Sequence, residues 1–416
     1  MNRVAIAGIG QTKYRTTYAD LNYVELVQLA VQRALEDSNL SMRDIDAFVF
    51  SMAPDAMVGI ANPERLCTDI VGARGKPFMR VNTGGSTGIV AVMTGFYHIA
   101  SGMFDTVLVA GAERTDESGD VQIILNKIWD PLYERHLPLN TISMLAMSAV
   151  RYMHKYGATE EHMAIVSSKA HRDAMDNPYA HVQKPVSVGD VLKSNYLCWP
   201  IKLLDACPSS SGACAMVLCS EEKAKTATKT PAWIKGVGHR LETYWLGDRM
   251  GPAAVYDHAD AHALSLAIQD AYRMAGVHDP VKEIDVAELY SAFSNIELHA
   301  VEAAGFCRKG EAPKLYEKGA FTRSSELPVN PSGGTLCSNP IAVTAMVRVA
   351  ETQIEQMLAA AAQVDKELED LRSQLAAKTA ELAASELRAG NAETVIEQIV
   401  DAIRTQLPTK LSIPTE

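Results

Sequence analysis

The chain has 416 residues, of which 47% are hydrophobic, so it is long enough for two or three domains with large buried cores. Its formal net charge of -11 argues against a surface that gathers nucleic acid or anionic membranes, since either ligand requires clustered Lys and Arg. The seven cysteines form no Cys-x-x-Cys pair and are odd in number, which is typical of free thiols in a reducing compartment. The same spacing gives no sign of a zinc site, so we expect no bound metal.

The amino-terminal segment MNRVAIAGIGQTKY enters an apolar run at once and lacks the features of a signal peptide. No apolar stretch approaches the roughly 20 residues that a membrane helix needs. We therefore expect a cytoplasmic protein with no membrane segment.

Residues 1–120 alternate between strand-like and helix-like patterns. A strand is predicted at VAIAGIG, an amphipathic helix over 21–35, and further strands at IDAFVFSM and KPFMRV. A glycine-rich turn, an apolar helix over 89–100 and the strand DTVLVAGAE follow. This rhythm predicts a parallel sheet with helices on its faces, and so an α/β class.

The remaining chain divides by composition. Residues 121–200 are less periodic and indicate a loop or cap region that returns to the first half. Residues 201–350 resume the alternation, with strands expected at GACAMVLCS, PAWIKGVGH and IDVAELY and a helix at HALSLAIQDAYRMAGV. The stretch Ile284–Leu289 repeats the pattern of Ile45–Phe50, which indicates a weak internal duplication.

Residues 351–416 are rich in Ala and Glu and predict a helical, heptad-like tail. Its apolar positions fall on helix faces, in two sets: Ala361, Val364, Leu368, Leu371, Leu375 and Leu382, then Val395, Ile396, Ile399, Ile403 and Leu407. The pattern fits a helical hairpin or oligomerising segment, and equally a solvated helix that packs on its own chain.

The segment VNTGGSTG, residues 81–88, follows a strand and opens an apolar helix, which aims backbone N–H groups at the turn. It resembles the nucleophile turn of thiolases of the sterol-carrier-protein branch, approximately V-N-N-N-C-S-T-G, with the cysteine position at Gly85. Further similar blocks follow in family order over residues 3–350. The resemblance implies a thiolase fold of two similar α/β halves in a five-layered α-β-α-β-α arrangement, followed here by the helical tail.

Thiolases of this type need a nucleophilic cysteine, an acid/base cysteine, an activating histidine and oxyanion donors. Glycine at position 85 cannot form an acyl-enzyme, although the N–H groups of Gly84 and Gly85 remain candidate oxyanion donors. Ser86 is either a substitute nucleophile or, more simply, the N-cap of the helix.

The family's H-D-C-F or N-E-A-F motif stands here as YSAF and begins at Tyr290. In this it resembles thiolase-like aldolases that cleave steroid side-chain CoA thioesters, which carry Tyr at that place and lack the nucleophilic cysteine. Tyr290 would then be an acid/base group, because a retro-aldol step needs no acyl-enzyme. The alternative is a core tyrosine at a strand end.

The loop GGTLCSNP replaces the family's Gly-His-Pro turn and offers two side chains. Asn339 is a candidate donor to a thioester oxygen, and Cys337 is either a catalytic thiol or a small buried residue. The Asn-Pro form resembles thiolase-like proteins that work with a zinc-ribbon, OB-fold partner, among them thiolases of bulky acyl groups such as benzoylsuccinyl-CoA.

Other features carry weaker expectations. The resemblance implies a homodimer paired through DTVLVAGAE, whereas the two final strands of thiolases have no counterpart in residues 351–416. His299 is expected on a helix surface, and the cysteines of GACAMVLCS and its flank in the core. Near the loop that would cover CoA, the cations that could meet its phosphates are Arg135, His136 and Lys155.

These observations predict an enzyme that cleaves or forms a carbon-carbon bond on a CoA thioester with a bulky acyl group, by retro-aldol or thiolase-type chemistry. Coenzyme A enters as part of the substrate, and no cofactor is permanently bound. The alternative is a non-catalytic acyl-CoA or lipid carrier subunit that scaffolds the zinc-ribbon partner.

Overall fold

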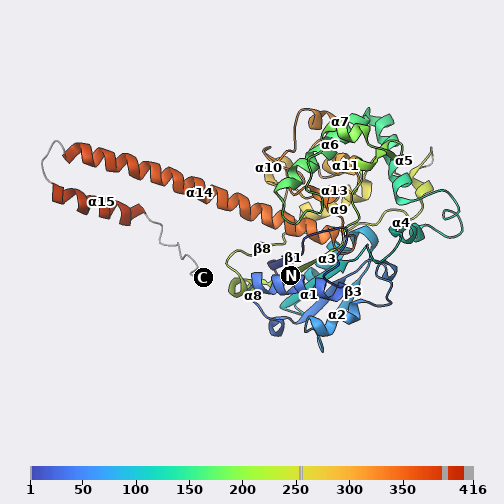
Figure 1. Cartoon of the computed structure of the whole chain (residues 1–416), viewed down its shortest axis with the longest axis horizontal. Helices are drawn as coiled ribbons and strands as arrows, with labels where there is room; N and C mark the ends of the chain where they lie inside the picture. Colours follow the sequence, from blue (N-terminus) through green and yellow to red (C-terminus); the bar gives the residue numbers. More distant parts are fainter. Residues whose placement is uncertain (1, 253, 255, 387–391, 407–416) are drawn as a thin grey trace. The chain divides into compact units, whose positions relative to one another are not determined.

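The computed structural model describes residues 2–252, 254, 256–386 and 392–406 (Figure 1). The chain divides into two compact units, residues 1–355 and 356–416. Their border lies close to residue 351, where the sequence predicts the start of the tail; the other predicted domain limits stay predictions.

The strands are β1 Val4–Gln11, β2 Ala47–Ser51, β3 Phe78–Val81, β4 Thr106–Glu113, β5 Tyr196–Cys198, β6 Ile201–Lys202, β7 Gly212–Ser220 and β8 Ala232–Trp233. The helices of the first part are α1 Tyr23–Asp37, α2 Glu64–Ile70, α3 Thr87–Ala100, α4 Val121–Leu125, α5 Thr141–Tyr156, α6 Glu160–Asp173, α7 Val188–Lys193 and α8 Glu221–Ala227. Those that follow are α9 His262–Ala275, α10 Pro280–Glu283, α11 Ser294–Ala303, α12 Ala312–Glu317, α13 Gly334–Cys337, α14 Thr344–Glu386 and α15 Ala392–Gln406.

A six-stranded mixed sheet with the order β3-β2-β4-β7-β1-β8 forms the centre of the first half. Strand β2 runs parallel to β3 and β4, as predicted, but β7 pairs antiparallel with both β4 and β1. The α/β class is therefore confirmed, while the strand GACAMVLCS, expected in the second half, completes the first sheet instead.

Alternate residues of β4 face opposite sides of this sheet, as the pleat of a strand requires. Leu108 and Ala110 pack in the same core cluster as α1, and Val107 and Val109 pack in the cluster of α3. Helix α1 lies so close to β1 that a Cβ at Gly10 would stand 1.9 Å from the carbonyl oxygen of Ala30. Both faces of the sheet are thus covered by helices.

Strand β4 pairs with β2 on one side and β7 on the other, and all eight of its residues are buried. The prediction that a homodimer pairs through DTVLVAGAE is therefore wrong, because this strand has no open edge. Within the described chain the edge strands of this sheet are β3 and the two-residue β8, and Met79 on β3 is 46% exposed.

The second half is mainly helical, with α5, α6, α7, α9 and α11 gathered on one side of the first unit (Figure 1). Among the described residues beyond β8, no strand ladder forms; the predicted strand IDVAELY is reduced to one parallel bridge between Ala287 and Val329. Its single pairing consists of Ala287 N–H to Pro328 O at 3.0 Å and Asn330 N–H to Ala287 O at 2.7 Å.

The tail is helical, as predicted. In the second unit, Leu368 and Leu375 on α14 are half-buried, whereas Ile396 on α15 is 68% exposed. The predicted heptad positions Ala361, Val364, Val395 and Leu407 lie outside the described side chains. In the part of the chain that the structure describes, no helix is both long and apolar enough to cross a membrane.

Candidate active site

The glycine-rich turn joins β3 to α3 and is held by short side-chain bridges. The hydroxyl of Thr87 accepts a hydrogen bond from Thr83 N–H at 2.9 Å and donates one to Gly84 O at 2.6 Å. Gly84 has φ +67°, which favours glycine, and its N–H donates to Asn82 Oδ1 at 3.3 Å. The N–H of Gly85 has no hydrogen-bond partner among the described residues, so this donor is free to meet a ligand.

Ser86 directly precedes α3 but does not cap it. Its hydroxyl turns back to Thr83, 3.0 Å from the carbonyl oxygen and 3.1 Å from Oγ1. It is also absent from the wall of the cavity described next, so the structure places it in neither expected role.

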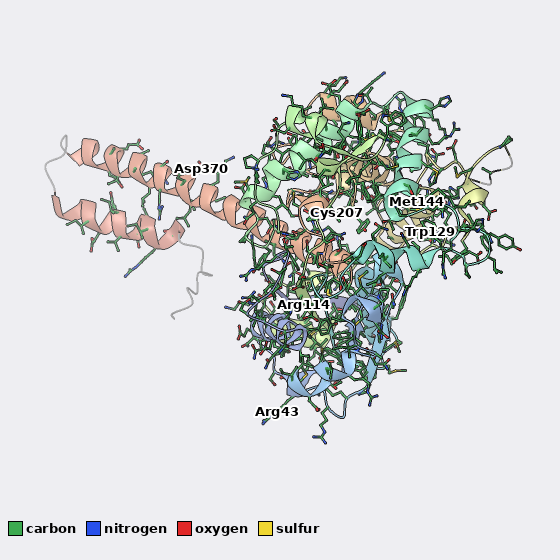
Figure 2. The ribbon with its side chains drawn as sticks, turned by 45° about the vertical axis from the view of Figure 1, so that its right-hand side comes forward. Arg43, Arg114, Trp129, Met144, Cys207 and Asp370 are labelled. Atoms are coloured by element: carbon green, nitrogen blue, oxygen red, sulfur yellow. The ribbon has the colours of Figure 1, made fainter. Side chains whose placement is uncertain are left out.

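A cavity of about 1060 Å³ opens beside this turn. Helices α4, α5 and α6, the loop 203–209, the segment 290–293 and the loop 336–341 supply its walls. Figure 2 labels Cys207 and Met144, which line it from different segments. Most of the wall is aliphatic or aromatic, and Gly84, Gly85, Tyr290 and Asn339 all reach it, so four of the six predicted site residues share one cavity.

Tyr290 faces the glycine turn across this cavity. A Cβ at Gly85 would stand 3.5 Å from Tyr290 Oη, and the tyrosine keeps 38% of its surface exposed because it borders the cavity. Burial, followed by the nearby thiol of Cys207, raises the pKa of Tyr290. At neutral pH the group is therefore a protonated phenol, which can donate a hydrogen bond.

Asn339 is held in one orientation. Thr344 Oγ1 donates to its Oδ1 at 2.8 Å, and its backbone N–H donates to Ser210 Oγ at 3.0 Å. Its Nδ2 then points to Cys207 Sγ at 3.0 Å. Because an amide NH₂ carries two hydrogens, one remains for a ligand oxygen.

Cys207 lines the cavity, although no sequence pattern separates it from the core cysteines. Its backbone N–H donates to Ala292 O at 2.9 Å, which ties its loop to the segment of Tyr290. Burial raises the pKa of its thiol to about 12, so the group is protonated.

Cys337 lies elsewhere. It is fully buried in the core of the second half, does not line the cavity, and burial raises the pKa of its thiol to about 12. Of the two roles considered for Cys337, its position agrees with that of a small buried residue.

The weaker candidates also lie outside the cavity wall. His299 is 7% exposed and packs on Tyr152 with ring centroids 4.4 Å apart, so its expected surface position is wrong. Arg135 donates to the carbonyl oxygen of Trp129, Lys155 pairs with aspartates, and His136 is exposed. Among the described residues, no cluster of three or more metal-binding side chains occurs.

His171 is a cavity residue for which sequence reasoning assigned no role. It lies near the end of α6, is 4% exposed and lines the cavity. Its helix position predicts only a core-facing residue, so no sequence signal distinguishes it.

Two family domains match the chain: the thiolase N-terminal domain over residues 4–191 and the thiolase C-terminal domain-like family over residues 253–388. The chain is 31% identical over 353 residues to the acetyl-CoA acetyltransferase of Methanothermobacter thermautotrophicus, covering 84% of this chain and 90% of that protein. It is 27% identical to sterol carrier protein 2 of Bos taurus, covering 84% and 65%. It is 26% identical to the benzoylsuccinyl-CoA thiolase subunit BbsB of Thauera aromatica, covering 85% and 89%.

Solved structures agree in fold. The structure of an Ltp2-ChsH2(DUF35) aldolase superposes with a TM-score of 0.71 at 28% identity, covering 84% of this chain and 88% of that chain. A monomeric SCP2-thiolase-like protein of Mycobacterium smegmatis gives 0.63 at 19% identity, covering 85% and 71%, which supports the fold alone. The chain therefore belongs to the thiolase superfamily, in its sterol-carrier-protein thiolase branch.

Proposed function

We propose that the chain is a carbon-carbon lyase that cleaves a β-hydroxyacyl-CoA thioester by a retro-aldol reaction. The observation that carries this proposal is the pairing of Gly85 with Tyr290: the nucleophile position holds no side chain, and a phenol faces it across the cavity. A covalent acyl-enzyme cannot form at glycine, but an aldol cleavage needs only proton carriers and a stabilised enolate.

The cavity wall supports a bulky apolar acyl group. Its volume of about 1060 Å³ is at the upper end of small-molecule sites, typically about 300–1,000 Å³. Aliphatic and aromatic side chains from separate elements face it, among them Ile124, Leu145, Leu204 and Phe293. Burying an apolar substrate against them contributes roughly 25 cal/mol per Å² of apolar surface, which favours a large acyl group.

The polar groups gather around the glycine turn. We propose that the thioester oxygen, which becomes the enolate oxygen, is bound by Gly85 N–H and by the second hydrogen of Asn339 Nδ2. Tyr290 stands beside this place as the proton donor, and its raised pKa means that the phenol carries its proton at neutral pH. Coenzyme A is then part of the substrate, and the reaction requires no permanently bound cofactor.

We also propose a zinc-ribbon, OB-fold partner and a homodimer. Support for the partner comes from two similar proteins, one named as an Ltp2-ChsH2(DUF35) aldolase and the other as a benzoylsuccinyl-CoA thiolase subunit. The dimer would use the open edge of β3. A reducing, cytoplasmic location would keep the thiol of Cys207 intact.

The test is a cleavage assay on β-hydroxyacyl-CoA and β-ketoacyl-CoA panels, with and without a zinc-ribbon, OB-fold protein of the proposed kind. We expect a β-hydroxy thioester to yield a ketone or aldehyde and a shortened CoA thioester, and Tyr290→Phe to lower kcat by about 10²–10⁴-fold. Tyr97→Phe is the matched control, because Tyr97 is 53% exposed and outside the cavity wall.

Other outcomes would refute the proposal. Cleavage of a β-keto thioester that consumes free CoA would mean Claisen chemistry by a thiol. Tight binding of acyl-CoA without turnover, alone and with the partner, would support the carrier alternative.

A further inference from the structure

We infer that His171 is the general base of this site, the group that removes the proton from the substrate's β-hydroxyl. The inference rests on the proposed function. It adds a proton acceptor, because the protonated phenol of Tyr290 cannot take up this proton. Its carrying observation is a buried imidazole, 4% exposed, that lines the cavity and has one ring nitrogen without a hydrogen-bond partner among the described residues.

The tautomer of His171 follows from its single hydrogen bond. Nδ1 lies 2.9 Å from the carbonyl oxygen of Ser167, one helical turn earlier on α6. Because a carbonyl oxygen only accepts, Nδ1 carries the hydrogen, and Nε2 keeps a free lone pair. Burial also lowers the pKa of His171, so the ring is neutral at neutral pH and able to accept a proton.

A chain of contacts links this imidazole to Tyr290. The hydroxyl of Ser167 donates to the carbonyl oxygen of Leu204, which fixes the loop 203–209 against α6. The same loop bonds through Cys207 N–H to Ala292 O at 2.9 Å, two residues beyond Tyr290. His171 and Tyr290 therefore line the same cavity from segments that are joined by hydrogen bonds through the loop 203–209.

The other titratable groups of the cavity are unsuited to accept this proton. Tyr290 and Cys207 are protonated, since burial raises both pKa values. Asp116 pairs with Arg114 at 2.9 Å and accepts from Ser211 at 2.7 Å. The carboxylate of Asp120 caps α4 by accepting from Gln122 N–H at 2.8 Å. Asp120 Oδ2 has no partner among the described residues, but this carboxylate is exposed, so His171 is the remaining buried acceptor with an uncommitted lone pair.

The reaction then balances without a further reactant. Nε2 of His171 takes the β-hydroxyl proton, the Cα–Cβ bond breaks, and the former alkoxide becomes a carbonyl. The electron pair of the broken bond forms the thioester enolate, whose Cα takes a proton from Tyr290 Oη. The phenolate recovers a proton from the imidazolium, directly or through water, and both groups return to their starting states.

The experiment compares His171→Gln with His98→Gln in the full chain. His98 is a matched control, because its Nδ1 bonds the carbonyl oxygen of Thr94 at 2.6 Å in the same helical pattern, yet it lies outside the cavity wall. Three quantities are measured: β-hydroxyacyl-CoA cleavage, binding of the same thioester, and mass-spectrometric carbethoxylation of each histidine by diethyl pyrocarbonate. The third does not depend on turnover.

We expect His171→Gln to lose about 10²–10⁴-fold in kcat with binding unchanged, and His98→Gln to match the wild type. In the wild type, His171 should be carbethoxylated, and the thioester should protect it. Cleavage by His171→Gln at the wild-type rate would overturn the inference while leaving the proposed function intact. If the wild type cleaves nothing, the proposed function fails; protection of His171 then keeps it as a ligand contact, and lack of protection overturns that too.

Discussion

The buried carboxyl group of Glu113 should stabilise the fold at low pH and lose that contribution as pH rises, and Glu113→Gln should remove this one contribution. Glu113 ends β4 and is 1% exposed. Its two oxygens accept hydrogen bonds from Ala342 N–H at 3.1 Å and Arg114 N–H at 3.2 Å. Burial outweighs these bonds and raises the pKa of Glu113 from 4.5 to about 7.

The sign follows from proton linkage. Between pH 4.5 and pH 7 the folded state binds the proton of Glu113 more tightly than the unfolded state does. The contribution of Glu113 to the free energy of unfolding is therefore full below pH 4.5 and is lost as pH rises through 7. A shift from 4.5 to about 7, at 1.36 kcal/mol per pH unit, corresponds to about 3 kcal/mol lost by pH 8.

The assay is urea unfolding of the wild type and Glu113→Gln at pH 5 and pH 8. Glu351 also has a raised pKa and titrates in both proteins, so its contribution cancels in the comparison. We expect the variant to gain about 2–3 kcal/mol relative to the wild type between the two pH values. The control is Glu222→Gln, at an exposed position. Parallel pH profiles for the wild type and Glu113→Gln would refute the reasoning.

Two glycines give opposite predictions. Gly10→Ala should destabilise the fold by about 1–3 kcal/mol in urea unfolding, because its Cβ would stand 1.9 Å from Ala30 O and push α1 off the sheet; an unchanged midpoint would contradict this packing. Gly85→Cys should fold like the wild type, because its Cβ meets its nearest neighbour, Tyr290, at an ordinary 3.5 Å. Its thiol should react with iodoacetamide and be protected by a β-hydroxyacyl-CoA, and an unreactive thiol at this position would contradict its exposure to the cavity.

Sequence patterns correctly predict the strands and helices whose formation depends on neighbouring residues in the chain. The apolar run of β4 and the apolar stripe of α1 correctly predict a sheet covered by helices, because a strand buried on both faces is apolar along its length and a helix packed on it is apolar on one side. Gly85 and Tyr290 could both be predicted as site residues from the sequence. Each stands at a position where the resembled family carries a characteristic residue type. The structure then brings these two positions within contact distance, which the sequence alone does not give.

Cys207 and His171 escaped prediction for a physical reason. Neither stands in a motif that the resemblance marks as functional, and the mostly apolar residues of a cavity wall cannot be told from core residues in the sequence. What distinguishes them is the hydrogen bond that each makes: Asn339 Nδ2 to Cys207 Sγ, and His171 Nδ1 to Ser167 O. The first bond links residues 132 positions apart in the chain. The second leaves the lone pair of His171 Nε2 free, and no sequence pattern predicts that this atom faces a cavity.

The strand at 284–290 shows how a correct local pattern depends on distant partners. Residues 47–51 become β2 because β3 and β4 pair with both of its edges, whereas Ala287 meets only Val329. From Thr344 onward the described residues are helical, so within them no strand is available to pair with this segment.

Near Tyr290, side-chain hydrogen bonds of Asn330 take the place of backbone pairing between strands. Asn330 accepts from Leu289 N–H at 2.6 Å through Oδ1, and its Nδ2 donates to Glu297 at 2.6 Å and to Ser291 at 3.2 Å. All these groups except the half-buried Leu289 lie within the core, where an uncompensated polar atom costs about 1–3 kcal/mol, so each bond resists displacement. A phenol that must keep its place opposite Gly85 is thus positioned by a buried amide rather than by a sheet, and the orientation of the site depends on Asn330 as much as on the fold.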